Sequence, residues 1–196
     1  LDVGPARIHG LIGPNGSGKT TTLNVISGYY RPQSGTVTLG GADLESGRPE
    51  TRAAHGIART FQNIRLFANL SALENVMIGR HVRTHAGVVG ALLRTPATRA
   101  EEAAIEKRAH ELLAMVGLDP TQYARRFPHE LSGGQQQRVG VARALAANPP
   151  VLLMDEPFGA VDPIVRGRLQ EEFRRLQAEL GKTVVFVTHD IDEAIR

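Results

Sequence analysis

The sequence contains no cysteine among its 196 residues, so disulfide bonds and thiolate metal sites are both excluded. It also lacks an apolar run of about eighteen residues or more, the length that a membrane-spanning helix needs. Charge of one sign is not in large excess: the net charge is +3 and both signs are interspersed, whereas nucleic-acid binders usually concentrate their charge. What remains is 41% hydrophobic and 22% charged, the composition of an ordinary globular domain that can bury one core.

A glycine-rich stretch near the amino end organises the chain. It fits the pattern G-x-x-x-x-G-K-[ST] and consists of Gly13, Pro14, Asn15, Gly16, Ser17, Gly18, Lys19 and Thr20. Glycines let the backbone turn tightly and direct successive N–H groups at a phosphate chain. In this pattern Lys19 supplies positive charge to the β- and γ-phosphates, and the Thr20 hydroxyl can bind Mg²⁺.

The residues around this loop support nucleotide binding. Residues 6–12 predict a short buried strand before it, and residues 21–27 predict a helix after it that Gly28 ends. The positive end of the helix dipole then points at the anion. A glycine turn that matches the pattern by chance is the alternative, and the order strand, loop, helix disfavours it.

The middle of the chain predicts helices. Residues 35–40 alternate like a half-exposed strand. Ser71–Glu74 is a capping box that predicts a helix through Ile78, with Gly79 beyond its end. Thr98–Glu101 is a second capping box and predicts a long helix that Gly117 ends.

This helix-rich segment lies between amino-terminal and carboxyl-terminal parts of the chain that are predicted to form strands. We therefore expect a helical subdomain, at about residues 68–148, inserted into an α/β core. Residues 81–96 contain two glycines and a proline and predict an irregular surface insertion or a broken helix.

The second half of the chain predicts a parallel crossover. Val151–Asp155 is an apolar strand with a carboxylate at its carboxyl end, where doubly wound sheets bind ligands. Asp162 caps a helix that begins at Pro163 and ends before Gly181, and residues 183–188 form another buried strand. The expected apolar face of this helix comprises Val165, Leu169, Phe173, Leu176 and Leu180. Strand, helix and strand in this order predict two parallel strands.

Five polar positions form a set of groups suited to phosphoryl transfer. Asp155 can orient Mg²⁺ through its waters, and Glu156 can polarise an attacking water. Taken alone, the two carboxylates could be an acidic strand end or a helix cap, and His189 could be structural. Together with Lys19 and Gln62 they supply a charge clamp, a metal site, an oriented water and a γ-phosphate sensor.

A second glycine motif decides the class of protein. It consists of Leu131, Ser132, Gly133, Gly134 and Gln135. A serine and two glycines at a helix start make a second anion site, unless they are a plain first turn. With this motif the chain resembles the ATP-binding subunits of ABC transporters over essentially all of its length.

The resemblance implies an α/β fold: a P-loop NTPase core of mostly parallel strands with flanking helices, an inserted helical subdomain and a small antiparallel β region. It makes residues 13–20 and Thr21 the ATP-binding loop, and makes Thr20, Gln62 and Asp155 the metal ligands. Glu156 becomes the general base and His189 the switch histidine. Asp162 falls in the loop that crosses the dimer.

The resemblance also implies partners. ATP is the substrate and Mg²⁺ the cofactor, and each signature motif, residues 131–135, closes over the ATP of a second ATP-binding subunit. That pair docks on integral-membrane permease subunits and, indirectly, serves a solute-binding protein, with no role for nucleic acid. The implied location is cytoplasmic, peripheral on the inner face of the cell membrane.

Two subfamilies share the resemblance. Residues 56–67 and the 81–96 insertion look like ATPases of branched-chain amino-acid importers. Residues 127–138, 154–160 and 187–194 look like those of glycine-betaine/osmoprotectant importers, which predicts a mosaic with a seam near residues 117–120. The family's adenine-stacking aromatic residue and terminal strands have no counterpart here, so we expect the chain to be a piece of a somewhat larger domain.

A soluble ABC-type ATPase of DNA repair, chromosome organisation or translation is the alternative function. Such proteins place long coiled coils or a second cassette beside these motifs. The short interval between Gln62 and Leu131 carries no sustained heptads, which disfavours the coiled-coil kind.

Overall fold

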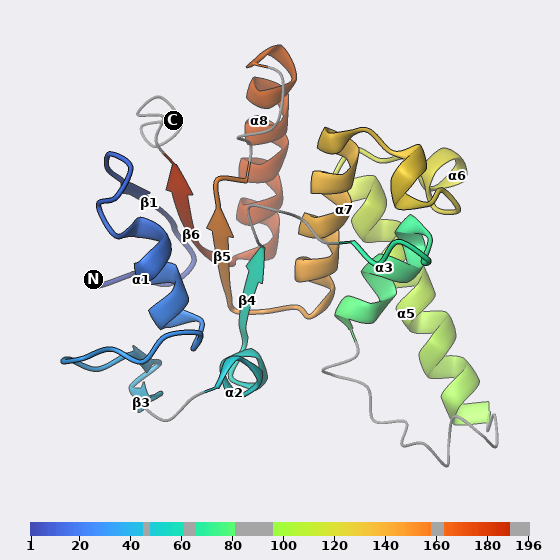
Figure 1. Ribbon diagram of the computed structural model, residues 1–196. Helices are drawn as coiled ribbons and strands as arrows, with labels where there is room; N and C mark the ends of the chain where they lie inside the picture. Colours follow the sequence, from blue (N-terminus) through green and yellow to red (C-terminus); the bar gives the residue numbers. More distant parts are fainter. Residues whose placement is uncertain (45–47, 61–65, 81–95, 158–162, 189–196) are drawn as a thin grey trace. The chain divides into compact units, whose positions relative to one another are not determined.

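The computed structural model describes residues 1–44, 48–60, 66–80, 96–157 and 163–188 (Figure 1). The chain divides into two compact units. The first comprises Leu1–Asn63, Pro149–Gly159 and Phe173–Arg196, and the second comprises Ile64–Asn148 and Ala160–Glu172. In the described ranges no helix has both the length and the apolar character needed to cross a membrane.

The first unit is built on a sheet of four parallel strands in the order β1-β6-β5-β4 (Figure 1). These strands are β1 (Ile8–Ile12), β4 (Ile57–Thr60), β5 (Val151–Asp155) and β6 (Thr183–Thr188). Helix α8 (Pro163–Leu180) connects β5 to β6, so the predicted parallel pairing across a helix is confirmed. Because all four strands run the same way, their carboxyl ends lie on one edge of the sheet.

The prediction of a buried first strand is wrong. Residues of β1 are half-buried or exposed, and Ile12 is 44% exposed. The reason is position, since β1 pairs only with β6 among the described strands, whereas β5 lies between two neighbours. Apart from the half-buried Val151 that opens β5, every residue of β5 and β6 is buried.

Helix α1 (Lys19–Ile26) packs on this sheet through Leu23, which is fully buried. Its end is as predicted, because Gly28 adopts a φ of +81° directly after the capping residue Ser27. The core beneath it also holds Leu44, Ile57, Leu153, Val185 and Val187.

A two-stranded antiparallel sheet precedes β4 in the chain. It pairs β2 (Thr38–Leu39) with β3 (Ala42–Asp43), and helix α2 (Pro49–Ala54) follows. Gly40 and Gly41 form the two-residue turn, both with positive φ, as hairpins of the type I′ class require. The strand predicted over residues 35–40 is therefore present but shorter. The expected fold class, a parallel α/β core with a small antiparallel region, is confirmed.

The second unit is helical. It comprises α3 (Ala72–Gly79), α5 (Pro96–Met115), α6 (Pro120–Tyr123), the short 3₁₀ helix Pro128–Glu130 and α7 (Gly133–Ala146), together with the first turns of α8. Helices α3, α5 and α7 pack pairwise against one another. Their contact is apolar and includes the buried side chains of Val76, Ala109, Leu112, Leu113, Val139 and Ala142.

One of the two predicted capping boxes is present. Ser71 accepts a hydrogen bond from the Glu74 amide, and the Glu74 carboxylate accepts from the Ser71 amide and hydroxyl, which lowers the pKa of Glu74. The box at Thr98–Glu101 is wrong. Helix α5 already includes Pro96, whose ring fixes a helical φ at a first turn, and Thr98 lies buried inside the helix. Gly117 ends this helix region with a φ of +71°, as expected.

Gly79 marks the closest approach of two helices. It was expected beyond the end of α3 but is the last residue of that helix. A Cβ built on Gly79 would overlap the Arg143 carbonyl oxygen of α7 and lie 3.1 Å from the Ala146 Cβ. Only glycine allows the two backbones to come this close.

We expect Gly79→Ala to lower the free energy of unfolding by about 1–3 kcal/mol, the usual effect of overpacking against atoms that cannot move. Gly167→Ala is the matched control, because Gly167 is also helical and its added Cβ would meet no atom within 4 Å in the part of the chain that the structure describes. The control should stabilise by about 0.5–1 kcal/mol. Urea denaturation followed by circular dichroism measures both, and equal stability of the two variants contradicts the close-approach argument.

Candidate functional site

The loop between β1 and α1 has the backbone of a phosphate-binding loop. Gly16 and Gly18 adopt φ values of +84° and +88°, in the left-handed region that disfavours other residues. At Gly13 a Cβ would lie 2.7 Å from the Ser17 hydroxyl oxygen. The backbone therefore favours glycine at positions 16 and 18 of the predicted motif, and at position 13 a larger residue would have to displace the Ser17 hydroxyl.

The loop also concentrates positive charge. Lys19 is only 8% exposed, and its ammonium donates hydrogen bonds to the carbonyl oxygens of Gly13 at 2.5 Å and Pro14 at 2.9 Å. It is thus held within the turn, next to the start of α1. That helix begins after Gly18, which has no side chain with which to cap the first amides. An anion at this point would meet both the ammonium and the positive end of the helix dipole.

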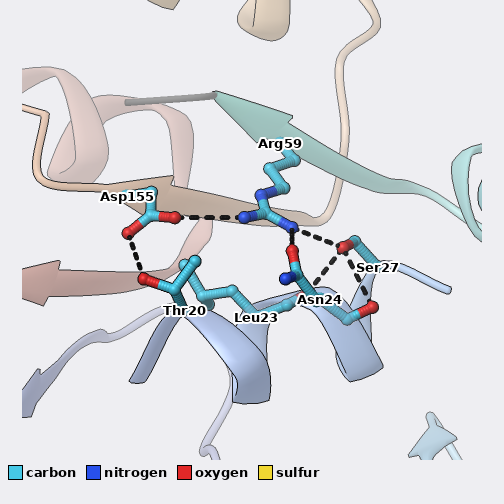
Figure 2. Close-up of polar contacts among 6 residues, drawn as sticks. All are labelled: Thr20, Leu23, Asn24, Ser27, Arg59 and Asp155. Carbon is cyan, nitrogen blue, oxygen red and sulfur yellow. Dashed lines mark hydrogen bonds and ion pairs between the residues drawn. The ribbon is translucent and has the colours of Figure 1, made fainter. Parts of the chain in front are cut away.

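Asp155 lies at the carboxyl end of β5 and faces the first turn of α1 (Figure 2). Its Oδ1 accepts a hydrogen bond of 3.4 Å from the Thr20 hydroxyl. A hydroxyl and a carboxylate oxygen are ligands that Mg²⁺ prefers, and at nucleotide sites the ion takes its remaining ligands from phosphates and water. The donor set therefore fits a magnesium ion beside the phosphate loop.

The other oxygen of Asp155 is bound by a residue that the sequence did not reveal. Arg59 of β4 donates from Nη2 to Asp155 Oδ2 at 3.0 Å (Figure 2). Its Nη1 donates to Asn24 Oδ1 at 2.6 Å and to Ser27 Oγ at 2.9 Å. The side chains of Arg59 and Asp155 are 7% and 4% exposed. Removing one partner of such a buried ion pair typically costs about 3–5 kcal/mol.

Helical spacing explains why α1 supplies these contacts. Thr20, Asn24 and Ser27 are four and three residues apart, so they lie on one face of the helix together with Leu23. Leu23 packs into the apolar core, and the three polar side chains flank it along the same face. The alternation of strand residues provides the signal that could have identified Arg59. Ile57 is buried two residues earlier, so Arg59 lies on the same buried face and needs a partner there.

Glu156 follows with an unusual backbone. Its φ is +45°, and its amide donates a hydrogen bond of 3.0 Å to the Val187 carbonyl oxygen. A glutamate in the left-handed region stores strain, and such strain gathers at functional sites. The turn takes Glu156 out of the alternation of β5 directly after Asp155.

The second glycine motif begins α7 in the helical unit. Leu131 is buried, and Ser132 is the N-cap, accepting at 3.3 Å from the Gln135 amide while Gln135 Oε1 accepts from the Ser132 amide at 2.8 Å. Packing among the described residues does not require the glycine at 133, since a Cβ there would meet none of their atoms within 4 Å. Gln62, Asp162 and His189 were also predicted as site residues and lie outside the described residues.

Comparison with known proteins agrees with this geometry. The family model described as ABC transporter matches residues 1–159. The glycine betaine/carnitine/choline transport ATP-binding protein OpuCA of Bacillus subtilis is 45% identical over 196 residues, which cover 100% of this chain and 47% of that protein. The glycine betaine uptake system ATP-binding protein YehX of Escherichia coli is 44% identical over 186 residues, covering 95% of this chain and 55% of that protein. The chain thus spans about half the length of these relatives.

Solved structures give the same result. The dimeric structure of MJ0796, a bacterial ABC transporter cassette, superposes with a TM-score of 0.82 at 34% identity, covering 100% of this chain and 80% of that one. A post-hydrolysis state of the same cassette, bound to ADP and Pi, also has a TM-score of 0.82 and covers 99% and 79%. The phosphate loop, the carboxylate strand and the signature motif occur in one chain that this family model matches, and the chain belongs to the ABC transporter family.

Proposed function

We propose that this chain is the ATP-binding and ATP-hydrolysing part of an importer for a small solute, a glycine-betaine type osmoprotectant or a branched-chain amino acid. The observation that carries the proposal is the convergence of the glycine loop, Lys19 and the Thr20–Asp155 contact at the carboxyl ends of β1 and β5. The relatives are named as transport or uptake ATP-binding proteins. Those names favour import over a soluble ATPase of DNA repair, chromosome organisation or translation, and favour the osmoprotectant over the amino acid.

The loop of residues 13–20, with Thr21, binds the ATP phosphates. Backbone amides and the Lys19 ammonium face the β- and γ-phosphates, while Thr20 and Asp155 hold Mg²⁺ together with Gln62. When bound, Mg²⁺ neutralises charge on the two terminal phosphates. The 2.5 Å and 2.9 Å bonds from Lys19 to loop carbonyls support this role, since they hold the ammonium in place before a nucleotide arrives.

Glu156 acts as the general base. Its carboxylate follows the metal carboxylate by one residue, and its left-handed backbone turns it out of the strand. It accepts a proton from the water that attacks the γ-phosphate. His189 contacts the γ-phosphate as the switch histidine.

The signature motif serves the ATP of a second subunit. Ser132, Gly133 and Gly134 form a helix start that is separate in sequence from the phosphate loop. No atom of the described residues would lie within 4 Å of a Cβ at Gly133, which supports an approach by another molecule. Two chains therefore pair head to tail and enclose two ATP molecules, with Asp162 in the loop that crosses between them.

Transport requires further partners. The dimer docks from the cytoplasm on integral-membrane permease subunits, which in turn receive solute from a binding protein. Residues 68–148 form the helical subdomain, and Gln62 lies in the segment that joins the metal site to the permease. The permease and binding protein select the solute.

Lys19→Ala should weaken ATP binding about tenfold to a hundredfold, because a hydrogen bond to a charged group contributes about 1.5–3 kcal/mol. Lys107→Ala, which removes an exposed lysine of α5, is the control and should bind ATP normally. Isothermal titration calorimetry with ATP measures both. Equal affinity of the Lys19 variant and the control would show that the loop does not hold the phosphates.

Glu156→Gln should lower ATP turnover by about 10²–10⁴ while ATP binding persists, since the amide keeps the shape but cannot accept the proton. An ATP-bound dimer should accumulate, visible by size-exclusion chromatography with light scattering, because hydrolysis is what opens it. Glu106→Gln on α5 is the control for a lost surface charge. Near-normal turnover in the Glu156 variant would remove the base role and transfer it to His189.

Complementation tests the two-chain site. Ser132→Arg should bind ATP through its own loop yet fail to hydrolyse it as a homodimer. When the Ser132→Arg and Lys19→Ala proteins are mixed, each heterodimer has one ATP site with both substitutions and one site with neither. Activity should therefore return, and it should be highest when the two proteins are mixed in equal amounts. A Ser132→Arg protein that is fully active at high dilution would contradict the proposal.

A further inference from the structure

The polar cluster at the end of α1 has a feature that the ATP-binding roles leave unexplained. Asp155 is the metal carboxylate of the proposed site, and its two oxygens face different partners. Oδ1 is directed at the Thr20 hydroxyl, whereas Oδ2 is bound by Arg59 (Figure 2). The two oxygens are chemically equivalent, but a carboxylate can rotate about its side-chain torsions, so some group must hold it in the orientation that presents one oxygen to the metal.

We propose that Arg59 is the positioning residue for the metal carboxylate. Its guanidinium holds Asp155 Oδ2 and so keeps Oδ1 turned toward Thr20, while Asn24 and Ser27 of α1 hold the guanidinium. This inference rests on the proposed magnesium–nucleotide site.

Three observations support the assignment. The 3.0 Å bond to Asp155 and the 2.6 Å and 2.9 Å bonds to α1 leave from different nitrogens, so the planar fork joins two elements at once. The side chain is 7% exposed, and burial limits the alternative rotamers open to it. Helix α1 carries both Thr20 and Asn24, one turn apart, and Ser27 caps its end. Arg59 therefore holds Asp155 in a fixed position relative to Thr20, the other proposed metal ligand.

The chemistry of this arrangement matches that of a partner outside the coordination sphere. Groups that hydrogen-bond a metal-binding carboxylate orient it, and their loss typically costs about 10–100-fold in metal affinity. A lysine offers one nitrogen rather than a fork and cannot reproduce the two-sided contact. The guanidinium also compensates the carboxylate charge when no metal is bound.

The test compares nucleotide affinity with and without magnesium, because this ratio reports metal binding independently of turnover. ADP affinity is measured by calorimetry in excess Mg²⁺ and again in EDTA. Arg59→Met should reduce the factor by which Mg²⁺ increases ADP affinity about tenfold or more. The ADP affinity in EDTA should stay close to that of the parent protein. A merely structural role would change both affinities alike and leave their ratio in place.

Arg52→Met is the matched control. Arg52 is another arginine of the same unit, 2% exposed on α2, and the same substitution there should leave the ratio unchanged. Asn24→Ala is the milder second variant, for use if Arg59→Met fails to fold. This variant keeps the charge of Arg59 but removes the 2.6 Å hydrogen bond from Arg59 to Asn24. The ratio of ADP affinities with and without Mg²⁺ should therefore fall by a smaller factor. In the double variant with Arg59→Met, the ratio should fall no further than in Arg59→Met alone.

The outcomes separate this inference from the function on which it rests. If the parent protein binds ADP no better with Mg²⁺ than in EDTA, the magnesium site itself is wrong. If the parent shows the magnesium effect and Arg59→Met retains or exceeds it, Arg59 does not position Asp155. An unchanged ratio in Asn24→Ala contradicts the anchoring by α1.

Discussion

The parallel pairing of β5 with both of its neighbours is the constraint on which the site depends. Parallel strands end at the same edge, and their side chains alternate between two faces. Leu153 and Ile57 therefore share the face that Leu23 covers, and Asp155 and Arg59 stand two residues further along it. Residues far apart in the sequence meet here because the register of β4 against β5 places the carboxyl ends of the two strands side by side. Helix α1 completes the cluster with Thr20 and Asn24, and Ser27 follows at its end.

The parts of this arrangement that follow from local rules were predictable from the sequence. Gly16 and Gly18 are favoured by the backbone of the loop itself, and β5 and β6 are apolar because they are covered. The first strand was predicted as buried because an apolar strand looks the same at an edge as in the middle of a sheet. The prediction of a second capping box was wrong because α5 already includes Pro96, two residues before Thr98. Proline favours the first turn of a helix, so Thr98 lies within the helix and cannot be its N-cap.

Arg59 shows what local rules leave out. Its partner Asp155 is 96 residues away and its anchor Asn24 is 35 residues away, so neither contact follows from spacing along the chain. The positive charge of Arg59 on the buried face of β4 indicates only that some hydrogen-bonding or acidic partner exists. Choosing that partner needs the register of β4 against β5, in which Thr60 faces Met154 and the aspartate comes next.

The two buried cations of the site differ in how their charge is balanced. The Lys19 ammonium is bonded to carbonyl oxygens, which carry only partial charge, so most of its charge remains to attract a phosphate. The Arg59 guanidinium faces a full carboxylate and is balanced already. A buried ion pair gains little net stability over apolar packing, because desolvation offsets the attraction. The stability of the fold therefore does not account for an arginine at position 59, whereas orientation of the carboxylate beside a phosphate loop does.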